Sequence, residues 1–341
     1  MIISAFFKKI NVLKIKEKMF LTNPPAQYIR NFKKIALLAA VFLCVGILFQ
    51  QNIQAQNVIT GSDGVNVDIS DKSGIISIGS SVTETIYALG AEENLVAVDI
   101  TSVYPQEADS LPKVPYTRNL TAEGVLSLNP TLIVASESAG PESVIKQIRS
   151  TNTPFLKLPS SETLEGALQR IEKLGAIFEK EKKAGGLISD IKNKLASASK
   201  IKDRVESPVS VLFIYARGPN SLSVAGKNTS AETMIELAGA ENAITNFEDY
   251  KPLNAEALAA ANPDVILMMN SGLSSLGGIE GLLKAPGVSM TNAAKNERIY
   301  TMDGNYLLGF GPRLGEAVLD LMNKFYPDTM TADIITSESK K

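Results

Sequence analysis

The two halves of this 341-residue chain share a phrase, and this repeat limits the folds that the chain can adopt. Residues 120–134 (LTAEGVLSLNPTLIV) and 253–267 (LNAEALAAANPDVIL) both read L-x-A-E-x-[VL]-x-x-x-N-P-x-[LV]-I-[VL]. Each copy predicts a helix followed by a strand. Because self-similarity within one chain indicates a repeated structural unit, the sequence predicts two similar lobes.

Strands and helices alternate in both halves, which predicts an α/β fold with mainly parallel sheets. The predicted strands lie at 75–78, 95–99, 131–135, 154–158, 209–215, 265–269 and 299–302, and the helices between them at 82–89, 121–128, 141–150, 229–238, 255–261, 279–284 and 312–325. Residues 163–204 are strongly helical, with a kink expected near Phe178. From 179 to 204 the helix would be about 39 Å long, at about 1.5 Å per residue. We therefore expect two Rossmann-like lobes joined by a single long backbone helix.

The N-terminal residues read as a secretory signal. Residues 1–55 hold eight basic side chains and one acidic one, and Arg30, Lys33 and Lys34 precede an apolar run of fifteen residues at 35–49. This pattern is typical of a signal peptide, with Met19 as a possible start. An uncleaved membrane anchor is the alternative, but the run is shorter than the roughly 20 residues of a spanning helix.

The remaining boundaries follow from composition. We expect a linker with one short edge strand at 56–74, an N-terminal lobe at 75–178, the bridging helix at 179–204, a C-terminal lobe at 205–326 and a polar tail at 327–341. In open α/β sheets ligands sit at the carboxyl ends of the strands. The ligand cleft is therefore expected between the two lobes.

Composition excludes several classes of function. The chain has no His, which rules out His-based zinc sites, Ser-His-Asp triads and His-ligated haem. Its single Cys, Cys44, lies in the apolar run; Leu43 before it is bulky for a lipoprotein motif, so Cys44 is expected to leave with the signal. Because residues 1–55 carry eight of the 34 basic side chains and one of the 36 acidic ones, the mature chain is acidic, which argues against nucleic acid as a partner.

A Tyr-x-Arg triplet, Tyr116 to Arg118, stands in a Pro-rich loop directly before a predicted helix start. A guanidinium near a phenol favours the phenolate. Phenolate is one of the axial ligands that haem iron accepts. The alternative is an ordinary half-buried loop tyrosine.

The chain resembles the periplasmic substrate-binding proteins of ABC importers whose lobes are bridged by one long helix, and among these the haem-binding members. The phrases that carry this resemblance are SIGSSVTETIYALGA, VDITSVYP, LPKVPYTRNLTAEGVLSLNPTLIVASESAGP, YKPLNAEAL and YLLGFGPR, between residues 77 and 313. It implies that Tyr116 is the axial ligand of ferric haem b, the transported ligand, and that Arg118 supports its phenolate. The family more often has Gly where this chain has Pro115. Some relatives add a His ligand, so its absence here implies a Tyr-only site or a second oxygen ligand.

Other side chains at the predicted cleft are candidates for contacts with the rest of the macrocycle. Arg217 and Arg313 could bind propionates, with surface ion pairs as the alternative. Ser80 and Ser81 lie at a helix N-terminus, where backbone N–H groups receive anions. The further pocket candidates are Tyr104, Tyr250, Tyr306 and Phe310, which could equally be lobe core, together with Ser136 and Glu137.

The resemblance also implies partners. Glu123 and Glu256 hold equivalent places in the repeated phrase. In the resembling family a glutamate at this place docks onto arginines of an ABC permease dimer, which works with a cytoplasmic ATPase. The alternative is that each glutamate only stabilises the start of its helix. We expect a periplasmic monomer, not an enzyme, that receives haem from an outer-membrane receptor.

Three other functions stay open. The chain could be a cobalamin or ferric-siderophore binding protein, or a membrane-tethered haem sensor without transport. It could also be an enzyme of the nitrogenase or chelatase shape, which would need Cys or His ligands.

Overall fold

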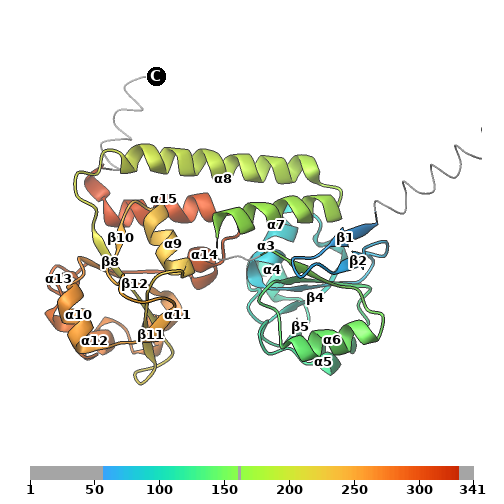
Figure 1. Cartoon of the computed structure of the whole chain (residues 1–341), viewed down its shortest axis with the longest axis horizontal. Coiled ribbons are helices and arrows are strands. Elements are labelled where there is room, and N and C mark those ends of the chain that lie inside the picture. Colours follow the sequence, from blue (N-terminus) through green and yellow to red (C-terminus); the bar gives the residue numbers. More distant parts are fainter. Residues whose placement is uncertain (1–56, 160–162, 330–341) are drawn as a thin grey trace, which may run out of the picture. The chain divides into compact units, whose positions relative to one another are not determined.

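The structure is a computed structural model that describes residues 57–159 and 163–329, shown in Figure 1. The described residues from Val58 onward belong to one compact unit. The predicted signal at 1–55 with Met19, and residues 330–341 of the predicted tail, lie outside the described residues.

The N-terminal lobe is built on a five-stranded sheet in the order β5-β4-β3-β6-β7, in which every neighbouring pair is parallel. Its strands are β3 (Ile75–Ile78), β4 (Leu95–Asp99), β5 (Lys113–Val114), β6 (Leu132–Ser136) and β7 (Phe155–Leu158). The connecting helices are α3 (Ser80–Leu89), the 3-10 turn η2 (Glu92–Asn94), α4 (Gln106–Asp109), α5 (Ala122–Leu126) and α6 (Glu142–Ser150). β3 and β6 are buried along their whole length, as expected of strands covered on both faces.

The C-terminal lobe has a mixed sheet in the order β11-β9-β8-β12-β13, with β10 also pairing with β8. β8 (Ser210–Ala216), β10 (Glu241–Asn242), β12 (Val265–Met269) and β13 (Ile299–Met302) run parallel. β9 (Leu222–Ala225) pairs antiparallel with both β8 and β11 (Tyr250–Pro252). Its helical segments are α9 (Ser230–Leu237), α10 (Ala255–Ala261), α11 (Asn270–Ser275), α12 (Ile279–Leu283), η3 (Val288–Met290), α13 (Asn292–Lys295), α14 (Gly304–Leu308) and α15 (Leu314–Phe325). The expected fold class, two α/β lobes with mainly parallel sheets, is confirmed.

Side-chain caps explain where several of these helices begin. The Thr121 hydroxyl accepts a hydrogen bond from the Gly124 N–H at 3.2 Å, and the Asn254 side chain accepts one from the Glu256 N–H at 2.8 Å. Such caps satisfy backbone donors that a helix start leaves without partners. The two copies of the repeated phrase therefore form the same motif, a capped short helix (α5 or α10) that leads into a buried strand (β6 or β12).

A long helix, α8 (Glu181–Lys202), follows α7 (Leu164–Ile177) and packs along both α7 and α15 (Figure 1). Ala184, Ile191 and Ala198 are buried at intervals of seven residues, so one face of α8 points inward. Glycines allow the close approach: a Cβ at Gly175 of α7 would lie 2.5 Å from the Ala184 Cβ, and one at Gly315 of α15 would lie 2.7 Å from the Lys194 Cβ.

The structure differs from the expected boundaries in three places. The stretch expected to be a linker forms a hairpin of β1 (Val58–Thr60) and β2 (Asn66–Asp68), held to the lobe by an ion pair between Asp63 and Arg149 at 2.7 Å. The kink expected near Phe178 is a break between α7 and α8, at Glu179 with a φ of 57°. The stretch between the predicted strand at 209–215 and the predicted helix at 229–238 contains β9, in which only Val224 and Ala225 are buried, so the apolar run that marks the central strands is missing.

Candidate functional site

A cavity of about 440 Å³ lies between the two lobes, within the range usual for small-molecule sites. It is lined by Gly79, Ser80, Ser81, Thr101, Tyr116, Thr117, Arg118, Ser136 and Ser138 of the N-terminal lobe, and by Tyr215, Arg217, Met269, Ser271, Asp303, Gly304, Asn305, Leu308 and Gly309 of the C-terminal lobe. These residues follow the carboxyl ends of strands in both sheets, where open α/β folds place ligands. Six of the sequence candidates are among them.

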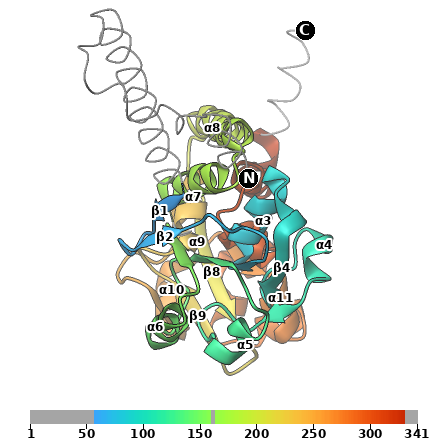
Figure 2. The same cartoon turned by 90° about the vertical axis from the view of Figure 1, so that its right-hand side faces the viewer.

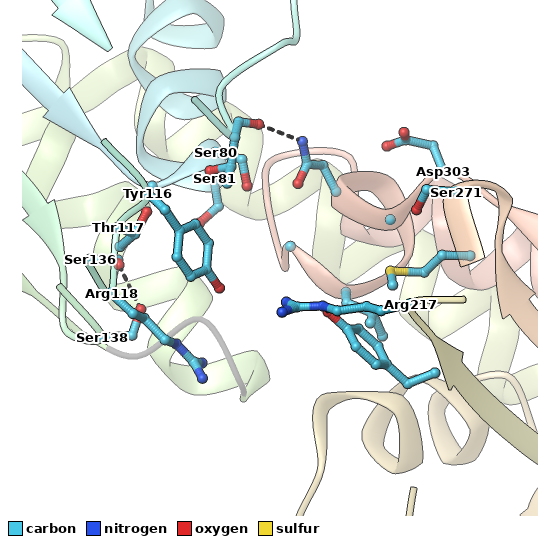
Figure 3. Close-up of a pocket in the computed structure, with 18 residues that line it drawn as sticks. Ser80, Ser81, Tyr116, Thr117, Arg118, Ser136, Ser138, Arg217, Ser271 and Asp303 are labelled. Carbon is cyan, nitrogen blue, oxygen red and sulfur yellow. Dashed lines mark hydrogen bonds between the residues drawn. The ribbon is translucent and has the colours of Figure 1, made fainter. Parts of the chain in front are cut away.

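Tyr116 projects into the cavity from the loop between β5 and α5, and its side of the cavity is shown in Figure 3. The residue is 37% exposed. Its carbonyl accepts a hydrogen bond from the Asn119 N–H at 2.7 Å, so the loop turns tightly here. Arg118, two residues on, lines the same cavity. The two side chains of the Tyr-x-Arg triplet thus reach one shared space from a single turn.

Arg217 enters the cavity from the opposite lobe, and in Figure 3 the Tyr116 hydroxyl points toward its side. The Arg217 Nε donates to the Tyr215 hydroxyl at 2.8 Å, and the guanidinium lies 5.3 Å from the centre of the Tyr215 ring. The pKa of Arg217 is raised above its ordinary value, first by the Tyr215 hydroxyl and also by the Tyr116 hydroxyl across the cavity. A fixed positive charge therefore faces the Tyr116 phenol.

The N-terminal start of α3 forms another wall. Gly79 precedes the helix with a φ of 111°, a conformation that favours glycine, and a Cβ there would lie 3.1 Å from the Ser136 Cβ. Ser80 and Ser81 follow it at the helix start, and Ser136 shares a hydrogen bond with Ser138 at 2.9 Å. This wall offers hydroxyl and backbone N–H groups, which suit an anionic group on a ligand.

Arg313 is not in the cavity, contrary to expectation. Its Nε and Nη2 donate to the two carboxylate oxygens of Glu84 in α3, at 2.6 and 2.8 Å. The guanidinium also lies 3.6 Å from the ring centre of Tyr104 and 4.8 Å from that of Tyr306. Arg313, Tyr104 and Tyr306 therefore do not line the cavity with the other candidates, because the three side chains and Glu84 contact one another across the junction of the lobes. We call these four residues the interlobe cluster.

Three other candidates also lie elsewhere. Tyr250 packs edge-on against Phe213 and Tyr215, with ring centres 6.4 and 6.0 Å apart. Phe310 is buried in the core, and Glu137 is exposed between two serines but does not line the cavity. Tyr250 therefore packs against the Tyr215 ring and does not line the cavity itself.

Sequence reasoning missed several lining residues, above all Tyr215, Ser271 and Asn305. Tyr215 lies near the carboxyl end of β8, and Ser271 and Asn305 follow the carboxyl ends of β12 and β13. This position could have identified them as candidate ligand contacts from the sequence. Asn305 also crosses between the lobes, since its Nδ2 donates to the Thr101 carbonyl at 2.8 Å.

We expect Arg313→Leu to destabilise the fold, because it leaves the Glu84 carboxylate buried without its partner. Removing one member of a buried pair typically costs about 3–5 kcal/mol. The side chains of Arg313 and Glu84 are 28% and 7% exposed, so a loss near the lower end is expected in the free energy of unfolding measured with urea. The double variant Glu84→Leu with Arg313→Leu should recover only part of the loss, because Arg170, whose pKa is lowered by burial, then loses the Glu84 charge that raises it. Equal stability of the wild type and the single variant would contradict a structural role for the interlobe cluster.

Glu123 and Glu256 are both exposed, each in the first turn of its helix, α5 or α10. In two views at right angles, α5 and α10 lie away from α8, toward the opposite side (Figures 1 and 2). The two lobes therefore present equivalent carboxylates away from the long helix.

Comparison with known proteins assigns the class. The chain matches the periplasmic binding protein family over residues 75–306, and it belongs to that family. It is 30% identical to an uncharacterised ABC transporter substrate-binding lipoprotein, YvrC, of Bacillus subtilis strain 168, over 86% of this chain and 96% of that protein. Within residues 57–159 and 163–329, the helices are too short or too polar to cross a bilayer.

Two further proteins bear on the ligand. A structure described as the periplasmic heme-binding protein RhuT from Roseiflexus sp. RS-1, in apo form, is 39% identical and superposes with a TM-score of 0.72, covering 75% of this chain and 99% of that one. A vitamin B12-binding protein of Vibrio parahaemolyticus is 25% identical over 74% of this chain and 88% of that protein. The chain is thus similar to binding proteins for two different metal macrocycles.

Proposed function

We propose that this protein captures ferric haem b in the cavity between its lobes, with Tyr116 as the iron ligand. The observation that carries this proposal is the Tyr116 phenol, which projects into a cavity also lined by Arg118 and Arg217. Guanidinium groups form charge-assisted hydrogen bonds with anionic oxygens, so their presence in the same cavity suits an iron-bound phenolate and a propionate. Phenolate is a known axial ligand of haem iron, and a chain without His offers no imidazole to compete with it.

The remaining polar walls suit the propionates of haem. Arg217 can form charge-assisted hydrogen bonds with a carboxylate once a ligand separates it from Tyr116. Ser80 and Ser81 offer hydroxyls and backbone N–H groups at the start of α3. With Tyr116 as the sole side-chain ligand proposed, the iron is either five-coordinate or completed by a second oxygen donor.

A cobalamin-binding function is the second candidate, favoured by the vitamin B12-binding relative. The identity to the haem-binding structure is higher, at 39% against 25%, over a similar share of the chain. A corrinoid also gives no reason for a phenol flanked by two arginines. We therefore place haem first.

Absorbance titration distinguishes these two ligands. The purified protein is expected to bind added hemin with a high-spin ferric spectrum and a phenolate charge-transfer band. Cyanocobalamin, added in equal amounts, should pass through equilibrium dialysis without enrichment on the protein side. Enrichment of cyanocobalamin together with an unchanged hemin spectrum would overturn the haem assignment.

We infer further that the protein works in the periplasm as a monomer, exported by a cleaved signal within residues 1–55. There it would receive haem from an outer-membrane receptor and deliver it to an ABC permease dimer with a cytoplasmic ATPase, contacting the permease through Glu123 and Glu256. Family membership and the substrate-binding relative support this transport role. A protein that keeps its N-terminal segment as an anchor and senses haem without transport is the alternative.

A further inference from the structure

Asp99, the last residue of β4, lies fully buried beneath the cavity and gathers donors from three loops. One carboxylate oxygen accepts the Gly79 N–H at 2.9 Å and the Ser102 hydroxyl at 2.7 Å. The other accepts the Thr101 hydroxyl at 2.6 Å and the Thr117 hydroxyl at 2.7 Å. Gly79, Thr101 and Thr117 all line the cavity, so a single side chain holds three of its walls.

A chain of buried hydroxyls extends this arrangement. Ser77 and Thr83 are hydrogen-bonded at 2.8 Å, and Thr83 and Ser102 also at 2.8 Å. The Ser102 hydroxyl donates its proton to Asp99, so it accepts a hydrogen bond from the Thr83 hydroxyl. The Thr83 hydroxyl in turn accepts a hydrogen bond from the Ser77 hydroxyl. All three hydroxyls therefore point toward Asp99. Hydrogen bonds oriented in series strengthen one another in a poorly solvated interior.

Thr117 is the link from this buried anchor to the candidate ligand. Its hydroxyl points inward to Asp99, while Tyr116 and Arg118 on either side line the cavity. The Thr117 carbonyl also accepts the Gly140 N–H at 3.0 Å, which holds its backbone against the loop after β6. Thr117 is 6% exposed, so its hydroxyl has little access to water as an alternative partner to Asp99.

We propose that Asp99, acting through Thr117, is the positioning residue that fixes the Tyr116 phenol and the Arg118 guanidinium in the cavity. This inference rests on the proposed function, because the phenol's position matters most when it binds a metal. Residues that orient a metal ligand from behind typically contribute about 10–100-fold to affinity. Asp99 holds the start of α3, through Gly79, in the same way, so the anion-binding wall and the iron ligand share one anchor.

The test compares three substitutions. Thr117→Val removes the hydroxyl and keeps the shape, Thr117→Ser keeps the hydroxyl, and Ser102→Ala takes a different donor from Asp99 without altering the cavity wall. Thr117→Val should weaken hemin binding about 10–100-fold and shift the charge-transfer band. Thr117→Ser should restore both, and Ser102→Ala should leave the band where it is. Wild-type affinity and an unshifted band in Thr117→Val, or equal losses in Thr117→Val and Ser102→Ala, would overturn the proposal.

Amide hydrogen exchange of the ligand-free protein separates this inference from the proposed function. In Thr117→Val the amides of residues 116–120 should exchange faster than in the wild type, whereas Thr117→Ser should match the wild type. This readout does not depend on hemin, so a wild type that fails to bind hemin would defeat the function and leave the positioning role measurable. Unchanged exchange in Thr117→Val would show that Asp99 does not hold the Tyr116 loop.

Discussion

Replacing Tyr116 by Phe is expected to abolish the phenolate charge-transfer band and to weaken hemin binding more than any other single substitution in the cavity. The change removes one oxygen and keeps the ring, so the walls of the cavity keep their shape. The loss should exceed the roughly 10–100-fold typical of residues that only support a metal ligand. Hemin titration followed by absorbance measures both effects.

Tyr250→Phe is the matched control, because Tyr250 is 39% exposed, close to the 37% of Tyr116, and lies outside the cavity. It should bind hemin like the wild type. Arg118→Ala should bind more weakly than the wild type and keep the fold, since the cavity loses a guanidinium that could form a charge-assisted hydrogen bond with an anionic oxygen. If Tyr116→Phe and Tyr250→Phe gave the same affinity and spectrum, Tyr116 would be an ordinary loop tyrosine.

The second large effect concerns delivery of the ligand. Reversing both equivalent carboxylates, Glu123→Lys with Glu256→Lys, should abolish stimulation of the permease ATPase in reconstituted vesicles at concentrations at which the wild type stimulates it, and leave hemin binding intact. Close charge pairs at protein interfaces are coupled by about 1.5–7 kcal/mol, so two reversals should raise the concentration needed for stimulation by more than about 100-fold.

A second double variant controls for charge alone. Glu181 at the start of α8 and Glu206 just after its end are also exposed, and α8 lies on the side away from α5 and α10 (Figure 1). Glu181→Lys with Glu206→Lys changes the net charge equally and should stimulate the ATPase normally. If the Glu123→Lys with Glu256→Lys variant stimulated the ATPase normally, these two glutamates would stabilise their helix starts and would not contact the permease.

The architecture could be predicted from local patterns. The repeated phrase and the alternation of strands with helices sufficed for two lobes with mainly parallel sheets, because each buried strand is a short apolar run bounded by turn residues. The rule that ligands lie at the carboxyl ends of strands brought Tyr116, Arg118, Ser80, Ser81, Ser136 and Arg217 to one cavity, as the structure has them.

The partners of charged side chains could not be predicted in this way. Arg313 lies beside glycines in a loop and looks available, but Glu84, its partner, is 229 residues earlier in the chain. Nothing in the local sequence marks such a pair. Tyr104 and Tyr306 stack on the Arg313 guanidinium, and neither of them lines the cavity.

The antiparallel strands β9 and β11 escaped prediction for a related reason. Only two residues of β9 and none of β11 are buried, so neither strand has the apolar run that marks β3, a strand of four residues. Arg217 and Tyr250 were therefore predicted only as pocket candidates, and the sequence did not predict that Tyr250 packs on Tyr215 or that the Tyr215 hydroxyl accepts a hydrogen bond from Arg217.

A resonance Raman spectrum of the hemin complex, excited within its charge-transfer band, tests the central claim most directly. If Tyr116 binds the iron, the spectrum of the wild type should show enhanced ring and C–O modes of an iron-bound phenolate, and these modes should be absent from Tyr116→Phe. Phenolate modes that persist in Tyr116→Phe, or a wild-type complex without them, would contradict Tyr116 as the iron ligand.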